Sequence, residues 1–199
     1  MTEVDAAVEA LLAGGAVVLP TDTVYGVATA TAVPGSTAAL FRLKQRPADV
    51  ALPVLCADEA SARGLAGDLP PGAEVLMTCC WPGPLTLVVS RRAGLDLDLG
   101  GPDDTTIGLR VPAADVVRTI ASRVGPLACT SANRHGQPTP TTAAAAAAAL
   151  GPGVAVVVDG GRCDGAPSTV VGWSEDGQHR ILREGAVSAG EVARLLGGG

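Results

Sequence analysis

Three hydroxyl-bearing side chains stand at every second position of a short polar segment, LPTDTVYG, near the N-terminus: Thr21, Thr23 and Tyr25. Alternate side chains of an extended chain share one face. We therefore expect the three hydroxyls to lie together, with Asp22 and Val24 on the other side. Such a row suits a small polar ligand, such as an amino acid or a phosphate. An ordinary turn between a strand and a helix explains the spacing equally well.

Two cations, Lys44 and Arg46, stand where a helix predicted over 37–44 gives way to Pro47. The residue before a proline is pushed out of the helical conformation, so Arg46 begins an extended stretch. An arginine fork beside a lysine point charge suits a polyphosphate, so both residues are candidates for phosphate binding. The alternative is a solvated pair that stabilises the C-terminus of the helix, and composition alone favours it.

Arg110 lies inside an apolar strand predicted over 107–111. A charge in such a place is rarely left unpaired, so Arg110 either forms an internal ion pair or faces the carboxylate of a ligand. Thr106 comes four residues earlier and is expected on the same face of the strand. A second arginine, Arg183, ends a strand predicted over 180–183, where a surface role explains it equally well.

Thr130, Ser131 and Asn133 belong to a Thr-Ser-Ala-Asn turn that follows a strand predicted over 127–130. In open α/β sheets, ligands bind at the carboxyl ends of the strands. The turn offers hydroxyls, an amide and backbone N–H groups. Ser131 has no paired histidine or acid nearby in the sequence, so hydrogen bonding is expected there and nucleophilic attack is not. The Ser-Thr pair at 168–169 opens another strand and could hold phosphate oxygens, although a surface role is an equal alternative.

Helices and strands alternate along the whole chain, which predicts an α/β fold with a mixed sheet in a single domain over residues 1–199. The stretch 93–105 mixes Leu, Asp and Gly and is expected to be a loop. Helices are expected over 4–12, 37–44, 58–65, 73–80, 113–124, 141–150 and 188–196. Strands are expected over 16–19, 52–56, 85–90, 107–111, 127–130, 154–159, 169–173 and 180–183.

Composition limits the classes of ligand. The formal net charge is −6, and a protein that grips nucleic acid by its phosphates usually carries a basic stripe. A small anionic ligand held by a few placed cations fits better. The five cysteines form no CxxC pair, so zinc spacing is absent. Neither GxxxxGK[ST] nor a GxGxxG after a strand occurs, so any ATP is bound without those loops.

The N-terminus lacks the pattern of a signal peptide, and no apolar run approaches the length of a membrane span. We therefore expect a soluble protein of the cytoplasm that has no contact with a membrane.

Six motifs occur in a fixed order between residues 14 and 185: PTDTVYG, KQRP, WPGPLT, LRVP, TSAN and STVV. In this order they resemble the YrdC family of threonylcarbamoyl-AMP synthases, and more specifically its short, single-domain form. The resemblance implies a twisted mixed sheet with flanking helices around a deep, positively lined cavity. It also implies a nucleotidyltransferase that forms threonylcarbamoyl-AMP and pyrophosphate from L-threonine, bicarbonate and ATP.

The resemblance also assigns roles to the candidate residues. It places Thr21, Thr23, Tyr25, Arg110 and Ser131 at the threonine. Lys44 and Arg46 would hold the ATP phosphates and act in catalysis, and further ATP contacts would come from Thr106, Thr130, Asn133, Ser168, Thr169 and Arg183. Mg²⁺ is expected to arrive with ATP, without a metal site built by the protein. The product would pass to the transferase that makes threonylcarbamoyladenosine in tRNA, and weak binding of tRNA itself stays open.

At one position near the expected threonine site, this sequence differs from the pattern of the family. Many members carry a His-Pro pair shortly after the KxRP segment, whereas this chain has Val50-Ala51. Any threonine contact from that histidine is lost or supplied elsewhere.

Two other classes of protein remain as alternatives: a paralogue of the same fold with a different acceptor or without synthase activity, and an RNA-binding module without catalysis. The acidic balance counts against the second.

Overall fold

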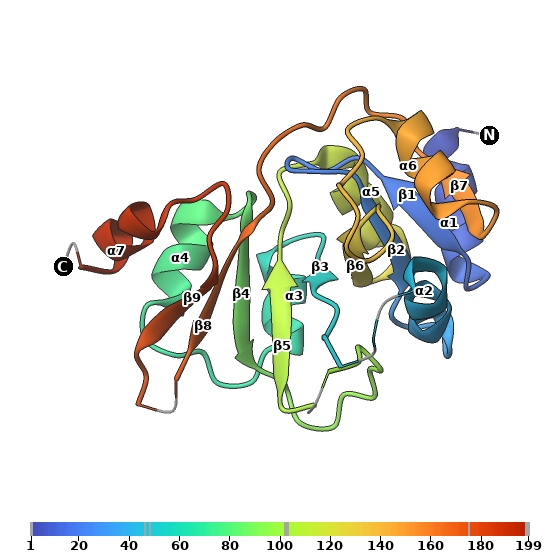
Figure 1. Cartoon of the computed structure of the whole chain (residues 1–199). Helices are drawn as coiled ribbons and strands as arrows, with labels where there is room; N and C mark the ends of the chain where they lie inside the picture. The colour runs from blue at the N-terminus through green and yellow to red at the C-terminus, as the bar shows by residue number, and fades with distance from the viewer. Residues whose placement is uncertain (1, 46, 48, 102–103, 175, 198–199) are drawn as a thin grey trace.

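A single twisted sheet organises the chain in the computed structural model, which describes residues 2–45, 47, 49–101, 104–174 and 176–197 (Figure 1). Within these residues, nine strands follow the order β7-β1-β2-β6-β3-β5-β4-β8-β9. Both parallel pairs, such as β4 with β8, and antiparallel pairs, such as β4 with β5, occur. The strands are β1 (Ala16–Leu19), β2 (Gly26–Ala30), β3 (Val54–Leu55), β4 (Leu85–Ser90), β5 (Thr106–Arg110), β6 (Leu127–Ser131), β7 (Val154–Val157), β8 (Thr169–Trp173) and β9 (His179–Arg183).

Helices cover both faces of one half of the sheet and one face of the other. Helices α1 and α5 pack together against one face of the β7-β1-β2-β6 half, and α2 and α6 pack near β1, β2 and β7. At the other end, α3, α4 and α7 share a core with β4, β5 and β8 (Figure 1). The helices are α1 (Glu3–Leu12), α2 (Ser36–Lys44), α3 (Glu59–Leu65), α4 (Ala73–Cys80), α5 (Asp115–Val124), α6 (Ala143–Leu150) and α7 (Ala189–Gly197).

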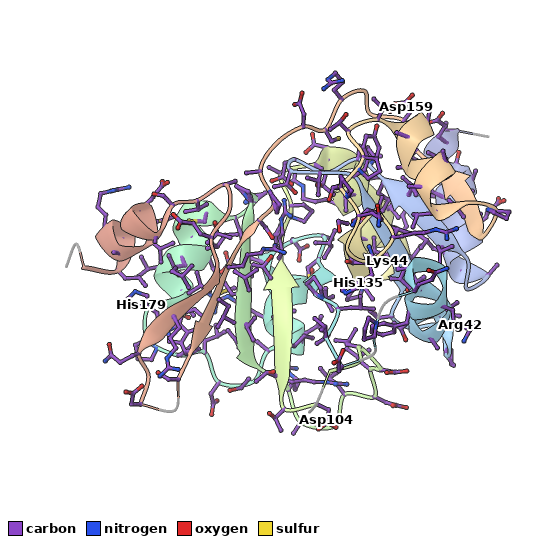
Figure 2. All side chains as sticks on the ribbon, viewed as in Figure 1. Arg42, Lys44, Asp104, His135, Asp159 and His179 are labelled. Atoms are coloured by element: carbon purple, nitrogen blue, oxygen red, sulfur yellow. The ribbon has the colours of Figure 1, made fainter. Side chains whose placement is uncertain are left out.

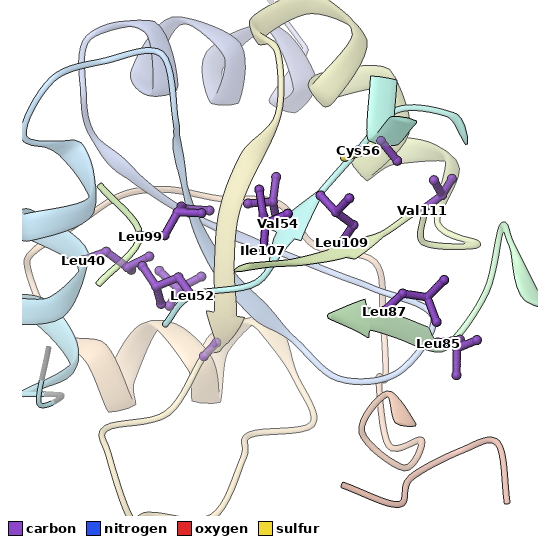
Figure 3. Packing of buried hydrophobic residues seen from close by; sticks show 14 of the residues in the cluster. Leu40, Leu52, Val54, Cys56, Leu85, Leu87, Leu99, Ile107, Leu109 and Val111 are labelled. Atoms are coloured by element: carbon purple, nitrogen blue, oxygen red, sulfur yellow. The ribbon is translucent and has the colours of Figure 1, made fainter. Parts of the chain in front are cut away.

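Strand β4 separates an apolar face from a polar one by simple alternation. Leu85 and Leu87 are buried in the core cluster together with Leu109 of β5, which pairs with Leu87 in the sheet (Figure 3). Successive side chains of a strand point to opposite faces, so Thr86 of β4 lies on the face away from that core. The functional site is built on this second face.

The predicted α/β class and mixed sheet are confirmed. The helix over 73–80 and the strand over 85–90 begin and end where the sequence predicts, and the described part of 93–105 forms no helix or strand. Strand β2 was not predicted, because its first residues were assigned to the polar segment before it. All five of its residues are buried, so the strand lacks the alternation that marks a half-exposed strand.

Among the described residues, no helix combines the length and the apolar character that crossing a membrane requires.

The packing of β4 predicts a sharp contrast between two leucines. Leu87→Ala removes a side chain that is 1% exposed, and we expect it to lower the free energy of unfolding by about 2–5 kcal/mol. Leu182→Ala, on β9, truncates a side chain that is 57% exposed and should change the free energy of unfolding by about 0.5 kcal/mol or less. Urea unfolding followed by circular dichroism measures both. Equal losses would contradict the assignment of Leu87 to the core.

Candidate active site

A cavity of about 480 Å³ opens on the face of β4, β5 and β8 that lies away from the core. Its wall is completed by the segment after β1, by residues 50–53 and by the end of β6. Among the described lining residues there is no carboxylate, and the charged ones are Arg110 and Arg183. The hydroxyl-bearing lining residues are Thr21, Thr23, Thr86, Thr106, Thr130, Ser131, Thr139 and Ser168.

Arg110 is 5% exposed and lines the cavity from the end of β5. Its Nε donates to the carbonyl of Gly83 at 3.0 Å, and a terminal nitrogen donates to Thr23 Oγ1 at 3.2 Å. The other terminal nitrogen forms an ion pair with Asp22 at 2.6 Å. Burial lowers the pKa of the guanidinium from its ordinary value, and the Asp22 carboxylate opposes that shift. The internal ion pair and the exposure to the cavity, posed above as alternatives, therefore occur together.

The WPGPLT motif supplies the turn that meets Arg110. The Gly83 N–H donates to the carbonyl of Val111 at 2.8 Å, so the turn is bonded to the end of β5. A Cβ at Gly83 would lie 2.3 Å from the carbonyl oxygen of Cys80, and no larger residue fits there without movement of the backbone. The motif thus fixes the position of a carbonyl that accepts a hydrogen bond from Arg110.

The segment after β1 is a tight turn, so the prediction that its hydroxyls alternate on one extended face is wrong. Thr21 Oγ1 accepts from the backbone N–H groups of Thr23 and Val24, both at 3.1 Å, and donates to the carbonyl of Val24 at 2.6 Å. These bonds to the local backbone compete with an extended conformation. Thr21 and Thr23 still lie together, 2.9 Å apart at their oxygens, and both line the cavity. Val24 lines it too, and Asp22 turns toward Arg110.

Tyr25 is fully buried and is not among the lining residues. Its hydroxyl donates to the carbonyl of Gly161 at 2.8 Å and accepts from the N–H of Gly160 at 3.1 Å. Burial raises the pKa of the phenol, so it stays protonated and can donate. The threonine contact expected of Tyr25 therefore has no support in this geometry.

Tyr25 instead holds the crossing segment, defined here as residues 158–168, which runs from β7 across to β8 (Figure 1). Asp159, near the start of this segment, lies 3.3 Å from the Tyr25 hydroxyl (Figure 2). Further along, the N–H of Gly165 donates to the carbonyl of Thr23 at 3.0 Å. The crossing segment is thus bonded to the turn that carries Thr21 and Thr23.

Of the Thr-Ser-Ala-Asn turn, Thr130 and Ser131 line the cavity and Asn133 lies behind them. The Ser131 hydroxyl donates to Asn133 Oδ1 at 2.5 Å, and the Asn133 amide donates to the carbonyl of Gln137 at 2.6 Å. Asn133 therefore shapes the turn that presents Thr130 and Ser131, and its predicted contact with ATP stays a prediction.

Lys44, at the end of α2, is 2% exposed and lies beneath the same turn (Figure 2). Its Nζ donates to the carbonyl of Ser131 and, at 2.6 Å, to that of Asn133. The lysine is not among the lining residues of the cavity, so its role at the ATP phosphates stays a prediction. Arg46, its predicted partner, lies outside the described residues.

Arg183 and Ser168 form a polar cluster next to Thr86, the residue of β4 that lies opposite Arg110 of β5. The guanidinium donates to the carbonyl of Ser168 at 2.7 Å and to its hydroxyl at 3.1 Å, and that hydroxyl lies 3.0 Å from Thr86 Oγ1. Partial burial lowers the pKa of Arg183. Thr106 lines the same wall from β5, on the face that carries Arg110, as predicted.

Thr169 points away from this wall and is not among the lining residues. Its hydroxyl donates to the carbonyl of Val187 and accepts from the N–H groups of Gly185 at 2.9 Å and Val187 at 3.1 Å. The hydroxyl is thus engaged in fixing the turn after β9, and the expected ATP contact finds no support here.

Sequence reasoning missed Thr86, Thr139 and Cys129 as lining residues. Alternation along β4 could have found Thr86, because it is the polar residue between Leu85 and Leu87. Thr139 lies in a Pro-rich loop where no periodicity operates. Burial raises the pKa of the Cys129 thiol to about 12, so this residue lines the cavity as a neutral thiol and does not act as a nucleophile. Val50 and Ala51 also line the cavity, at the position of the expected departure.

Comparison with known proteins gives a consistent result. A family model named Sua5_yciO_yrdC, with the description "Telomere recombination", matches residues 9–185. A protein of Mycobacterium tuberculosis, provisionally named threonylcarbamoyl-AMP synthase, is 39% identical over 96% of this chain and 88% of its own length. The human threonylcarbamoyl-AMP synthase is 35% identical over 96% of this chain and 70% of its own.

Solved structures agree with the sequence matches. The structure of Pyrococcus abyssi Sua5 complexed with L-threonine superposes with a TM-score of 0.91 and 31% identity, covering 99% of this chain and 58% of that one. Escherichia coli YciO gives a TM-score of 0.81 at 24% identity, covering 92% of this chain and 88% of that one, which speaks for the fold alone.

The contacts of Lys44 predict a loss of stability on truncation. Lys44→Ala leaves the carbonyls of Ser131 and Asn133 without this donor, and an unsatisfied buried polar group costs about 1–3 kcal/mol. We expect a lower melting temperature by differential scanning calorimetry. Arg42→Ala is the control, because Arg42 is an exposed cation of the same helix. An unchanged melting temperature for Lys44→Ala would show that the lysine does not hold the turn.

Proposed function

Because this chain belongs to the Sua5/YciO/YrdC family, we propose that it is a threonylcarbamoyl-AMP synthase. As a nucleotidyltransferase it would form threonylcarbamoyl-AMP and pyrophosphate from L-threonine, bicarbonate and ATP. The observation that carries the proposal is the cavity itself. It brings two arginines, Arg110 and Arg183, and eight hydroxyl-bearing side chains to one wall, without a carboxylate among its described lining residues.

The threonine would lie at the end formed by Arg110, Thr23 and Ser131. Arg110 offers the charge-assisted donors that a carboxylate requires, inside a site where burial strengthens them. Thr21, Thr23 and Ser131 offer hydroxyl oxygens within the same wall. Val50 and Ala51, where many relatives carry His-Pro, would form an apolar border further along the wall, toward Thr106.

ATP would lie along the wall formed by Thr106 and Thr130, with Arg183, Ser168 and Thr86 among its contacts. Guanidinium and hydroxyl groups suit phosphate oxygens. Lys44 and Arg46 remain the proposed cations for the triphosphate. The described lining residues offer no carboxylate to ligate a metal, so Mg²⁺ would be held by the phosphates of ATP and by water. None of the steps proposed here depends on protein ligands to that ion.

In the chemical step, an oxygen of the threonine carbamate would form a bond to the α-phosphorus of ATP. The bond from that phosphorus to the α,β-bridging oxygen would break, and pyrophosphate would leave with the electron pair. The carbamate is already an anion, so this step requires no general base. The protein would contribute positioning and countercharge, which are the main terms in catalysis at phosphorus.

The product would be consumed by a transferase that places the threonylcarbamoyl group on tRNA. Binding of tRNA by this chain is not needed for the synthase step. Weak binding stays a prediction that a salt titration of RNA affinity would test.

The proposal predicts pyrophosphate release that depends on every substrate. Purified protein given L-threonine, bicarbonate and Mg-ATP should release pyrophosphate, as measured by an enzyme-coupled phosphate assay, and the product should appear as threonylcarbamoyl-AMP in mass spectrometry. Omission of threonine, or its replacement by serine, should reduce the rate at least about ten-fold, equivalent to about 1.4 kcal/mol. Equal rates with and without threonine would overturn the proposal.

Arg183 should affect the binding of ATP and not that of threonine, for which Arg110 is proposed. Arg183→Ala removes charge-assisted donors from the proposed contacts of ATP, and we expect KM for ATP to rise about ten-fold while KM for threonine changes about two-fold or less. Initial rates over both substrate concentrations give the two constants. Arg180→Ala is the matched control, since Arg180 is an exposed arginine of the same strand. A change in KM for threonine alone would place the nucleotide elsewhere.

A further inference from the structure

The guanidinium of Arg110 is held from three sides by groups of the protein. Gly83 accepts from Nε, Thr23 from one terminal nitrogen and Asp22 from the other. Each terminal nitrogen of a guanidinium carries two hydrogens, so one hydrogen on each remains beyond these bonds. Arg110 lines the cavity. A planar fork with one hydrogen on each terminal nitrogen is the arrangement that binds the two oxygens of a carboxylate.

Two of the three holding groups are neighbours in the sequence, at the turn closed by Thr21. Thr21 gives its hydroxyl hydrogen to the carbonyl of Val24, so the hydrogen between Thr21 and Thr23 comes from Thr23. Thr23 Oγ1 is then left as an acceptor for Arg110. Thr23 therefore donates to Thr21 and accepts from Arg110, and the turn presents acceptors to the arginine.

Asp22 has the shortest contact in this set, at 2.6 Å, and its side chain is 14% exposed. It does not belong to the lining residues of the cavity, so it acts on the far side of Arg110 from the ligand space. We propose that Asp22 is a positioning residue for the amino-acid substrate: it fixes the plane of Arg110 so that the remaining hydrogens face the substrate carboxylate. This inference rests on the proposed function, because it takes threonine as the ligand of Arg110.

The opposite role is physically available. A carboxylate beside Arg110 also reduces the positive charge that a substrate would meet. If Asp22 only competed with the substrate for the guanidinium, its removal would tighten threonine binding. If it positions the guanidinium, its removal weakens threonine binding, because the freed arginine can rotate away or bond to other groups. The sign of the effect separates the two roles.

The experiment compares Asp22→Ala, Asp22→Asn and the unmodified protein by isothermal titration with L-threonine and by steady-state kinetics. Asp22→Ala should weaken threonine binding about ten-fold or more and raise KM for threonine in parallel, while KM for ATP changes about two-fold or less. Asp22→Asn keeps an oxygen at the same place, so it should recover most of the affinity. This recovery would not occur if the negative charge alone mattered.

Asp164→Ala is the matched control. Asp164 forms an exposed pair with Arg162 at 3.2 Å and adjoins Val24 by a β-bridge, so the change removes an aspartate next to the same turn without touching Arg110. It should leave both KM values unchanged. Melting temperatures of all variants identify any that fail to fold. If Asp22→Ala does not fold, Asp22→Ser takes its place, because its shorter side chain also loses the contact with Arg110.

Three results would overturn the inference while the proposed function stands, and a fourth would overturn both. Tighter threonine binding by Asp22→Ala would make Asp22 a competitor, and unchanged binding by this variant would make the pair irrelevant to substrate. Equal rises in KM for ATP and for threonine would indicate general damage to the fold. A failure of the unmodified protein to bind threonine at all would overturn the proposed function, and the inference with it, which distinguishes that case from the others.

Discussion

A buried guanidinium is the constraint on which the site depends. Arg110 is almost wholly removed from water, and a charge in that position is tolerated only when its hydrogens find acceptors. Those acceptors come from the turn at Asp22 and Thr23 and from the glycine turn at Gly83, which approach the end of β5 from different parts of the chain. The need to satisfy one side chain therefore fixes the place of two loops. The cavity is the space that these loops and the sheet leave between them.

The same strands build the core and the cavity. Leu87 and Leu109 face the helices, whereas Thr86 and Arg110, one residue away along each strand, face the ligand space. A slip of register by one residue would exchange the two faces, so the packing of the core also guarantees the polarity of the site. Aromatic residues make up 2% of the chain, and none occurs among the described lining residues. A bound base would therefore lie against aliphatic carbons.

Local pattern predicted the elements well where burial alternates or where proline and glycine end a segment. Strand β2 escaped detection because its sequence, GVATA, is neither the continuous apolar run that marks a buried strand, as in β1, nor the alternation that marks a half-buried one. At the site, the alternation rule placed Thr106 with Arg110 correctly but failed for Tyr25, since the Thr21 side chain bonds to the backbone and bends the segment that the rule assumes extended. The partners of Arg110 and Tyr25 lie up to 136 positions away, and a single sequence carries no signal for such distant contacts.

The crossing segment at 158–168 has a consequence for the order in which the molecule assembles. It bonds to Tyr25 and to Thr23 across more than half the length of the chain. Contacts between distant parts of a chain form only after the entropy of closing the intervening loop has been overcome. The helices and the β4–β5 hairpin are local and can form early. The hydrogen bond from Gly165 to the turn that carries Thr23, by contrast, forms only once the last third of the protein is present. A ribosome-bound chain that ends before residue 158 would thus have most of the sheet but not yet a finished site.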